Sequence, residues 1–210
     1  MACAAVAETL TGKFKLPDSR EMLIKAALAA NRRIAEEAAQ SPEKSGMGTT
    51  LIAVLAEPLK RGALLRWVSV GDSPFWIWRR KTRELIRVNA IHSLYGEMVQ
   101  EVQDGLLTRE EAERDPRNTQ RNVLTLSLAG GDLSPERMDC PDSALQIDQK
   151  DIVIIASDGI ETLSAEDISG TVRQFRKKGP EAISEALLER LRSLDMPGQD
   201  NSSVIVMTCA

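Results

Sequence analysis

The chain has 210 residues, of which 42% are hydrophobic, and a formal net charge of −4 at pH 7. A chain of this length can bury about 70% of its unfolded surface, so the composition favours one domain with a sizeable core over a disordered or fibrous protein. The 31 acidic residues slightly outnumber the 27 basic ones, and this balance gives no support to nucleic acid as a partner.

The cysteine and histidine content narrows the possible chemistry. Cys3, Cys140 and Cys209 form no Cys-x-x-Cys pair, so we expect neither a disulfide framework nor a zinc site, but a reduced, cytoplasmic protein. No secretion signal is seen, and no apolar run approaches the roughly 18 residues of a membrane-spanning helix. His92 is the single histidine, which excludes a histidine-cluster metal site. Any chemistry is therefore expected to come from carboxylates.

The N-terminal quarter of the chain is predicted to hold two helices and a strand. Residues 1–12 are small and apolar, which indicates a helix. Asp18 opens a capping-box pattern, and the apolar residues after it recur at helical spacing as far as Gln40. Residues 51–56 then form an apolar run typical of a strand.

The next segment is predicted to contain three short strands, at residues 64–70, 75–78 and 85–88. Short connections between them indicate an antiparallel meander. Trp76 and Trp78 lie on one face of the second of these strands. Two tryptophans on one strand face are expected to pack in the core rather than to form a binding platform.

Two short helices and a further strand follow in the middle of the chain. The helices are expected at residues 97–104 and 109–114, and Thr108 with Glu111 forms a capping box for the second one. Residues 121–128 are predicted to form a strand, because apolar residues alternate with polar ones there.

Residues 151–160 contain the most strongly predicted element of the chain, a buried strand that runs into Ser157-Asp158-Gly159. Gly159 can adopt the positive φ of a tight turn at no steric cost. Such a turn would leave the Asp158 carboxylate at the end of a rigid strand, a position that suits metal binding. An Asp-Gly turn with no further role is the alternative interpretation.

The C-terminal segment is predicted to hold two helices and a last strand. A helix is expected over residues 164–178 with Ser164 as its cap, Pro180 opens a second helix, and residues 203–208 form the strand. No repeat, low-complexity tract or linker divides the chain. Residues 1–210 are therefore predicted to form a single α/β (α+β) domain with mainly antiparallel strands and helices outside them.

Three aspartates lie at the ends of predicted strands. Asp72 and Asp158 each follow a strand, and Asp200 precedes one. If the strands that flank Asp158 and Asp200 are antiparallel neighbours, these two carboxylates lie close together. Carboxylates that close repel unless a proton or a cation compensates, and oxygen ligands suit Mg²⁺ or Mn²⁺. The spacing alone leaves open that these are three turn aspartates at separate corners.

Six short motifs follow one another along the chain. They are Gly46-Met47-Gly48-Thr49-Thr50, Val70-Gly71-Asp72-Ser73, His92-Ser93, Arg121-Asn122-Val123-Leu124-Thr125, Ala156-Ser157-Asp158-Gly159 and Asp200-Asn201. Their order resembles that of the metal-dependent type 2C (PPM-type) serine/threonine protein phosphatases, and the stretch from His92 to Arg121 resembles the bacterial branch. The resemblance covers essentially the whole chain.

The resemblance implies a four-layer α-β-β-α sandwich of two mainly antiparallel sheets with a metal site of two or three Mg²⁺ or Mn²⁺ ions. It implies that Asp158 and Asp200 are the catalytic, metal-holding residues and that Asp72 helps to bind a third, weaker metal. A metal-activated water would attack the phosphorus of a phosphoserine or phosphothreonine. The implied partners are a phosphorylated protein and a serine/threonine kinase or its targets.

The resemblance has a gap at its start. In the family, an early acidic segment and an Asp-Gly-x-Gly-Gly segment supply the other metal-ligating aspartates, and a phosphate-binding arginine lies near them in well-studied members. This sequence holds none of these, and Ala4 to Leu10 resembles the helix that normally follows the glycine segment. We therefore expect an N-terminally incomplete family domain in which the first strands of a sheet are missing.

Three functional interpretations remain open at this point. The ordered motifs favour a protein phosphatase, and the missing ligands favour a catalytically dead pseudophosphatase that acts as a protein-binding or regulatory module. A carboxylate-metal hydrolase of small phosphoesters is the third interpretation. For His92 a structural hydrogen-bonding role is expected rather than that of a general acid.

Overall fold

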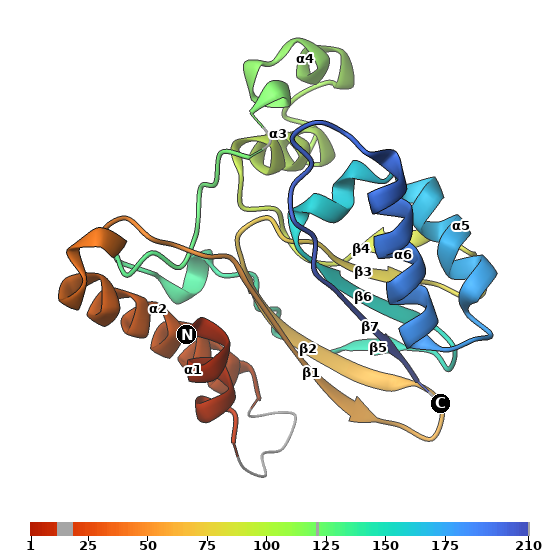
Figure 1. Ribbon diagram of the computed structural model, residues 1–210, viewed down its shortest axis with the longest axis horizontal. Helices are drawn as coiled ribbons and strands as arrows, with labels where there is room; N and C mark the ends of the chain where they lie inside the picture. Colours follow the sequence, from red (N-terminus) through yellow and green to blue (C-terminus); the bar gives the residue numbers. More distant parts are fainter. Residues whose placement is uncertain (12–18, 121, 210) are drawn as a thin grey trace. The chain divides into compact units, whose positions relative to one another are not determined.

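The computed structural model describes residues 1–11, 19–120 and 122–209, which form a mixed α+β fold with two antiparallel sheets (Figure 1). One sheet has the strand order β1-β2-β5 and consists of β1 (Leu51–Pro58), β2 (Ala63–Val70) and β5 (Leu145–Ile147). The other has the order β4-β3-β6-β7 and consists of β3 (Phe75–Trp78), β4 (Leu85–Arg87), β6 (Ile152–Ala156) and β7 (Val204–Thr208). The predicted mixed fold with two mainly antiparallel sheets is confirmed.

The described helices match the predicted ones closely. They are α1 (Ala2–Thr9), α2 (Ser19–Gln40), α3 (Leu94–Gln103), α4 (Arg109–Arg114), α5 (Ala165–Phe175) and α6 (Pro180–Leu194). Helix α3 begins earlier than predicted because the Ser93 side chain caps it and accepts the Gly96 N–H. The predicted cap Asp18 lies outside the described residues. None of the helices in the described ranges combines the length and the hydropathy that crossing a bilayer requires.

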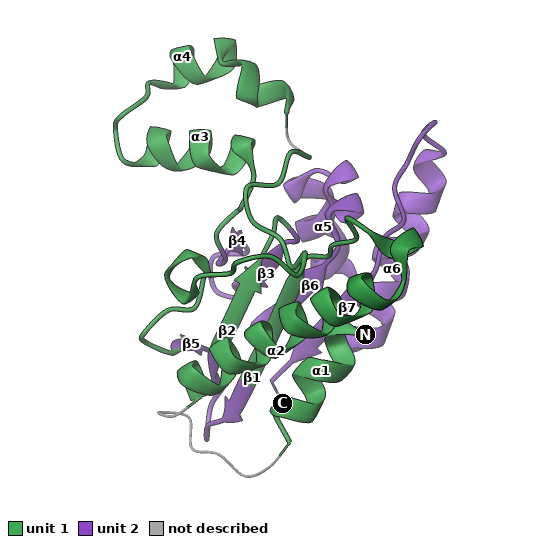
Figure 2. Ribbon diagram, turned by 90° about the vertical axis from the view of Figure 1, so that its left-hand side faces the viewer, with its two compact units in different colours: residues 1–55, 66–72, 90–144 green, residues 56–65, 73–89, 145–210 purple. Residues whose placement is uncertain are grey.

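The described part of the chain divides into two compact units (Figure 2). Unit 1 consists of residues 1–55, 66–72 and 90–144, and unit 2 consists of residues 56–65, 73–89 and 145–210. Each unit contains its own hydrophobic core. The single domain over the whole chain stays a prediction.

The core of unit 1 lies under helix α2. The buried face of this helix is rich in alanine, which allows the helix backbone to approach its neighbours closely. The face packs with α1 and with apolar residues of β1 and β2. The fully buried members of this core are Leu23, Ala26, Ala27, Ala30, Val68 and Leu128.

Residues 121–128 do not form the predicted strand. In the described part of this segment, Leu124 makes an isolated β-bridge to Ser93, and Leu128 makes one to Thr49. Leu128 is buried in the unit 1 core, whereas Leu124 is exposed. The alternation of apolar and polar residues that predicted a strand therefore belongs to an irregular segment, in which Leu126 and Leu128 cover the core.

The core of unit 2 lies between the second sheet and helices α5 and α6. Trp78 packs there with Ile152 and Ile154 of β6, and α6 contributes a stripe of Ile183, Leu187 and Leu191. Trp76 and Trp78 are 7% and 1% exposed, so their predicted place in the core is confirmed.

The predicted meander is wrong at one step, because β2 and β3 belong to different sheets. Strand β3 pairs with β4 as expected, but its other neighbour is β6, with Trp76 opposite Ile154. The connection between β2 and β3 begins with Gly71, whose φ is +103°. A glycine in this conformation lets the chain turn sharply out of one sheet.

Candidate metal centre

The strands that flank Asp158 and Asp200 are antiparallel neighbours, as predicted. In the register of β6 and β7, Ala156 lies opposite Val204. Beyond that pair, the Ser157 N–H donates to the Ser203 carbonyl at 3.0 Å, and the Ser203 N–H donates to Ser157 Oγ at 3.0 Å. The end of β6 is therefore fastened to the start of β7, and the segments that carry the two aspartates come together.

Gly159 shows how closely these segments approach. A Cβ atom on this residue would lie 2.5 Å from Ser202 Oγ and 2.8 Å from the Asn201 carbonyl oxygen. The φ of Gly159 lies outside the left-handed region, so the predicted positive φ is wrong. Glycine is required here for lack of space, since any side chain would push the Asp158 turn away from residues 200–202.

The two carboxylates are held in the same way. Asp158 Oδ1 accepts the Gly159 N–H at 2.9 Å, and Asp200 Oδ1 accepts the Asn201 N–H at 2.8 Å. Asp158 is partly buried and Asp200 is exposed. Within the described ranges, the second oxygen of each carboxylate makes no hydrogen bond or ion pair, so it is available to a ligand.

The donor set around this pair fits a hard divalent cation. It consists only of oxygen atoms, which Mg²⁺ and Mn²⁺ prefer. Ser202 Oγ is buried beside the Asp158 turn and has no hydrogen-bond partner among the residues described. In the same part of the chain, no three His, Cys, Asp or Glu side chains are grouped closely enough to hold a metal ion. The described chain thus offers two carboxylates to an ion.

Asp72 lies in unit 1, directly after β2 and Gly71. It is buried, at 9% exposure. A Cβ atom on Gly71 would overlap the side chain of Thr50, so glycine is required at this turn both for space and for its φ of +103°. The turn fixes the position of Asp72 within unit 1, and its role as an accessory metal ligand stays a prediction.

His92 supports the same turn of unit 1. Its Nδ1 lies 3.1 Å from both the backbone nitrogen and the carbonyl oxygen of Gly71, and its backbone N–H donates to the Gly71 carbonyl at 3.0 Å. Burial lowers the pKa of His92 below its ordinary value. The ring and the backbone of His92 both contact Gly71, so the geometry supports the structural role expected from the sequence.

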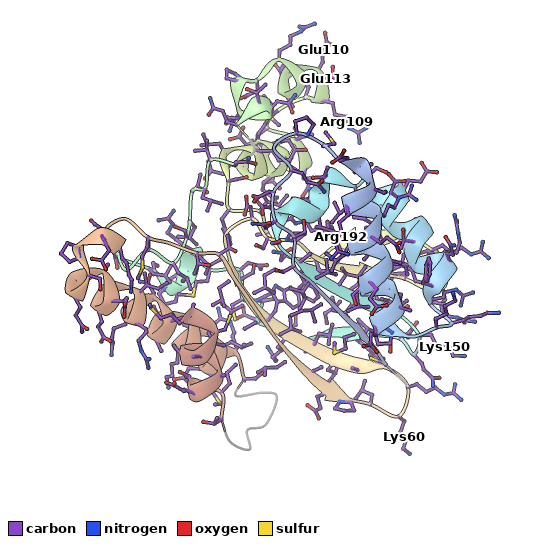
Figure 3. All side chains as sticks on the ribbon, viewed as in Figure 1. Lys60, Arg109, Glu110, Glu113, Lys150 and Arg192 are labelled. Carbon is purple, nitrogen blue, oxygen red and sulfur yellow. The ribbon has the colours of Figure 1, made fainter. Side chains whose placement is uncertain are left out.

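A cavity of about 330 Å³ adjoins Asp200 in unit 2. It is lined by Leu188, Leu191, Arg192, Gln199, Asp200, Asn201 and Ser202. Figure 3 labels Arg192 on helix α6, and Gln199 Nε2 donates to the Leu191 carbonyl near the end of that helix at 3.0 Å. Sequence reasoning missed Arg192, because the residue only follows the apolar stripe of α6 and no motif marks it.

Comparison with known proteins gave matches among solved structures alone, since no family model and no curated protein matches. The chain is 26% identical to the serine/threonine phosphatase PstP/Ppp of Mycobacterium tuberculosis, with a TM-score of 0.75 over 98% of this chain and 78% of that one. It is 27% identical to the serine/threonine phosphatase of S. agalactiae, with a TM-score of 0.75 and coverages of 98% and 77%. It is 28% identical to the PPM Ser-Thr phosphatase MsPP of Mycobacterium smegmatis, solved in complex with cacodylate, with a TM-score of 0.71 and coverages of 99% and 81%.

Proposed function

Since this chain is similar in fold and sequence to PPM-type serine/threonine phosphatases, we propose that it hydrolyses phosphoserine and phosphothreonine in proteins with the help of bound Mg²⁺ or Mn²⁺. The observation that carries the proposal is the contact between the Asp158 turn and the segment from Asp200 to Ser202. It brings together the two backbone segments that carry these carboxylates, at the end of the paired strands β6 and β7.

Two solved structures support the assignment of ligands. The catalytic domain of the phosphatase PstP, which is 25% identical to this chain, was solved in complex with 2 manganese ions. MsPP was solved with cacodylate, a tetrahedral oxyanion that resembles phosphate. A divalent metal and a phosphoryl group are therefore the ligands we assign to the site in unit 2.

Each residue of the site is proposed to have a separate role. Asp158 and Asp200 would hold the ion through their free oxygens, while Oδ1 of each stays bound to the backbone N–H that orients it. A divalent ion there supplies Lewis-acid chemistry, because it lowers the pKa of water and offsets charge on the phosphoryl group. Gly159 keeps the two segments in contact, and Asp72 is proposed as an accessory ligand.

The proposed substrate is a phosphorylated protein, and the kinase that modifies it or the targets of that kinase are candidate partners. We place this reaction in the cytoplasm, where unpaired cysteines stay reduced. The free thiols of Cys3, Cys140 and Cys209 are compatible with that compartment.

The experiment that tests the proposal compares substrates and metals. We expect release of phosphate from a phosphothreonine peptide that requires Mn²⁺ or Mg²⁺, at a higher kcat/KM than from small phosphate metabolites. Asp158→Asn is expected to abolish the reaction, because the amide gives the ion a weaker ligand. A preference for the metabolites would instead indicate a small-phosphoester hydrolase.

A pseudophosphatase is the second candidate, and one observation favours it. Within the described residues the carboxylate pair is not extended to a group of three metal-binding side chains. A chain that binds a phosphoprotein without hydrolysing it, and that binds it equally well as Asp158→Asn, would favour this alternative.

A further inference from the structure

Arg192 is a cation beside the carboxylate pair that the proposed mechanism leaves unused. Its side chain lines the same cavity as Asp200, and the structure shows no ion pair for its guanidinium in the described part of the chain. Arg190, two residues earlier on α6, is paired with Asp167 instead. The guanidinium of Arg192 is therefore available to a ligand in the cavity.

The cavity offers further polar groups on the side opposite α6. Asn201 and Ser202 line it together with Asp200, and Ser202 Oγ is buried without a hydrogen-bond partner in the described ranges. A volume of about 330 Å³ lies at the lower end of the range of about 300–1,000 Å³ that is usual for small-ligand sites. The lining thus combines hydrogen-bond donors with a carboxylate that is proposed to hold a metal.

This combination fits a phosphoryl group. The planar guanidinium of arginine presents paired N–H donors that match the oxygens of phosphate, and such charge-assisted hydrogen bonds are stronger than neutral ones. The carboxylate of Asp200 alone would repel a phosphoryl group, and Arg192 would add a second positive charge to that of the proposed metal ion.

We propose that Arg192 binds the phosphoryl oxygens of the substrate beside Asp200. The inference rests on the proposed function, because it deepens the account of the same site.

Two simpler roles of Arg192 compete with this one. A cation in the last turn of a helix stabilises the partial negative charge of the helix C-terminus. Arg192 can also swing onto Asp200 and neutralise it, in which case the two side chains form a surface ion pair. Each of these roles makes its own prediction in the experiment below.

The test measures binding of inorganic phosphate by calorimetry, with and without saturating Mg²⁺, and the KM and kcat for p-nitrophenyl phosphate. The variants are Arg192→Met, Arg192→Lys and the control Arg190→Met, which removes the same charge from the same helix. We expect Arg192→Met to weaken phosphate binding and to raise KM by about tenfold or more, since charge-assisted hydrogen bonds are lost. Arg192→Lys should be intermediate, and Arg190→Met should stay close to the wild type.

Other outcomes overturn the inference. Unchanged phosphate binding and KM in Arg192→Met, with a lower melting temperature, would assign Arg192 to the helix end. Unchanged phosphate binding with tighter Mg²⁺ binding would assign it to an ion pair with Asp200. A wild-type chain that binds no phosphate also refutes the inference.

The proposed function fails separately. Phosphate binding that depends on Arg192 in a chain that hydrolyses nothing would refute the phosphatase activity and leave the inference standing. Metal-dependent hydrolysis with a KM that does not change in Arg192→Met would support the phosphatase activity and refute the inference about Arg192.

Discussion

At the scale of single residues, His92 is a partly buried base that contacts one turn of the backbone. Its Nδ1 and its backbone N–H both contact Gly71. Burial of the ring disfavours its charged form, because that form loses hydration. The folded state of unit 1 therefore favours the neutral ring.

The sign of the pH dependence follows from this preference. Burial lowers the pKa of His92 in the folded state, whereas the unfolded ring titrates near its ordinary pKa of about 6.5. Below that pH the unfolded chain binds more protons, so stability falls as the pH drops and reaches its plateau above it. We predict that the melting temperature falls between about pH 7.5 and about pH 5.5, and that the fall is shallower in His92→Asn. Identical slopes in the two proteins would contradict the prediction.

Residue types and spacing predicted that the strands next to Asp158 and Asp200 are neighbours, but not the residues that line the cavity with Asp200. Asp158 and Asp200 were recognisable because each lies at the end of an apolar run, where the side chain is fixed. Arg192 was not recognisable, because an arginine in the last turn of a helix usually interacts with the helix terminus or with solvent. Its position against Asp200 depends on how α6 packs, which local sequence does not encode.

At the scale of elements, the contact between the Asp158 turn and residues 200–202 depends on one glycine. Gly159→Ala would place a Cβ atom 2.5 Å from Ser202 Oγ. We predict a loss of about 1–3 kcal/mol in the free energy of unfolding, as for other overpacked sites, together with weaker metal binding. Urea unfolding and Mn²⁺ titration measure the two effects.

A matched control is available in the same unit. Gly170 lies inside helix α5, and a Cβ atom on it would have no neighbour within 4 Å. Gly170→Ala is therefore expected to stabilise unit 2 by about 0.5–1 kcal/mol, because alanine is the better helix former. A loss of stability in Gly170→Ala, or an unchanged stability in Gly159→Ala, would contradict the prediction that a Cβ atom fits at Gly170 but not at Gly159.

Local sequence patterns predicted most helices and strands, but not which strands pair with each other. Strand β3 (Phe75–Trp78) and helix α4 (Arg109–Arg114) have the predicted bounds, because a run of large apolar residues and a complete capping box mark them. The meander failed because the choice between β2 and β6 as the neighbour of β3 is decided by contacts distant in sequence. The false strand at residues 121–128 failed because alternation alone does not distinguish a paired strand from an irregular segment over a core.

At the scale of the whole molecule, metal binding should increase the free energy of unfolding. A ligand that binds only the folded state adds about 2.7 kcal/mol to the free energy of unfolding at a concentration one hundred times its Kd. We predict that Mn²⁺ raises the melting temperature of the wild type, that the rise is lost in Asp158→Asn, and that a chelator reverses it. An equal rise in wild type and variant would place the ion elsewhere in the chain.

The central claim is that the two described carboxylates support metal-dependent hydrolysis of a phosphoester. The most direct test is the rate of p-nitrophenyl phosphate hydrolysis by this chain as a function of Mn²⁺ concentration, with Asp158→Asn as the control. The account predicts a rate that rises to saturation with Mn²⁺ in the wild type and is abolished in the variant. No hydrolysis by a wild-type chain that circular dichroism shows to be folded would contradict it.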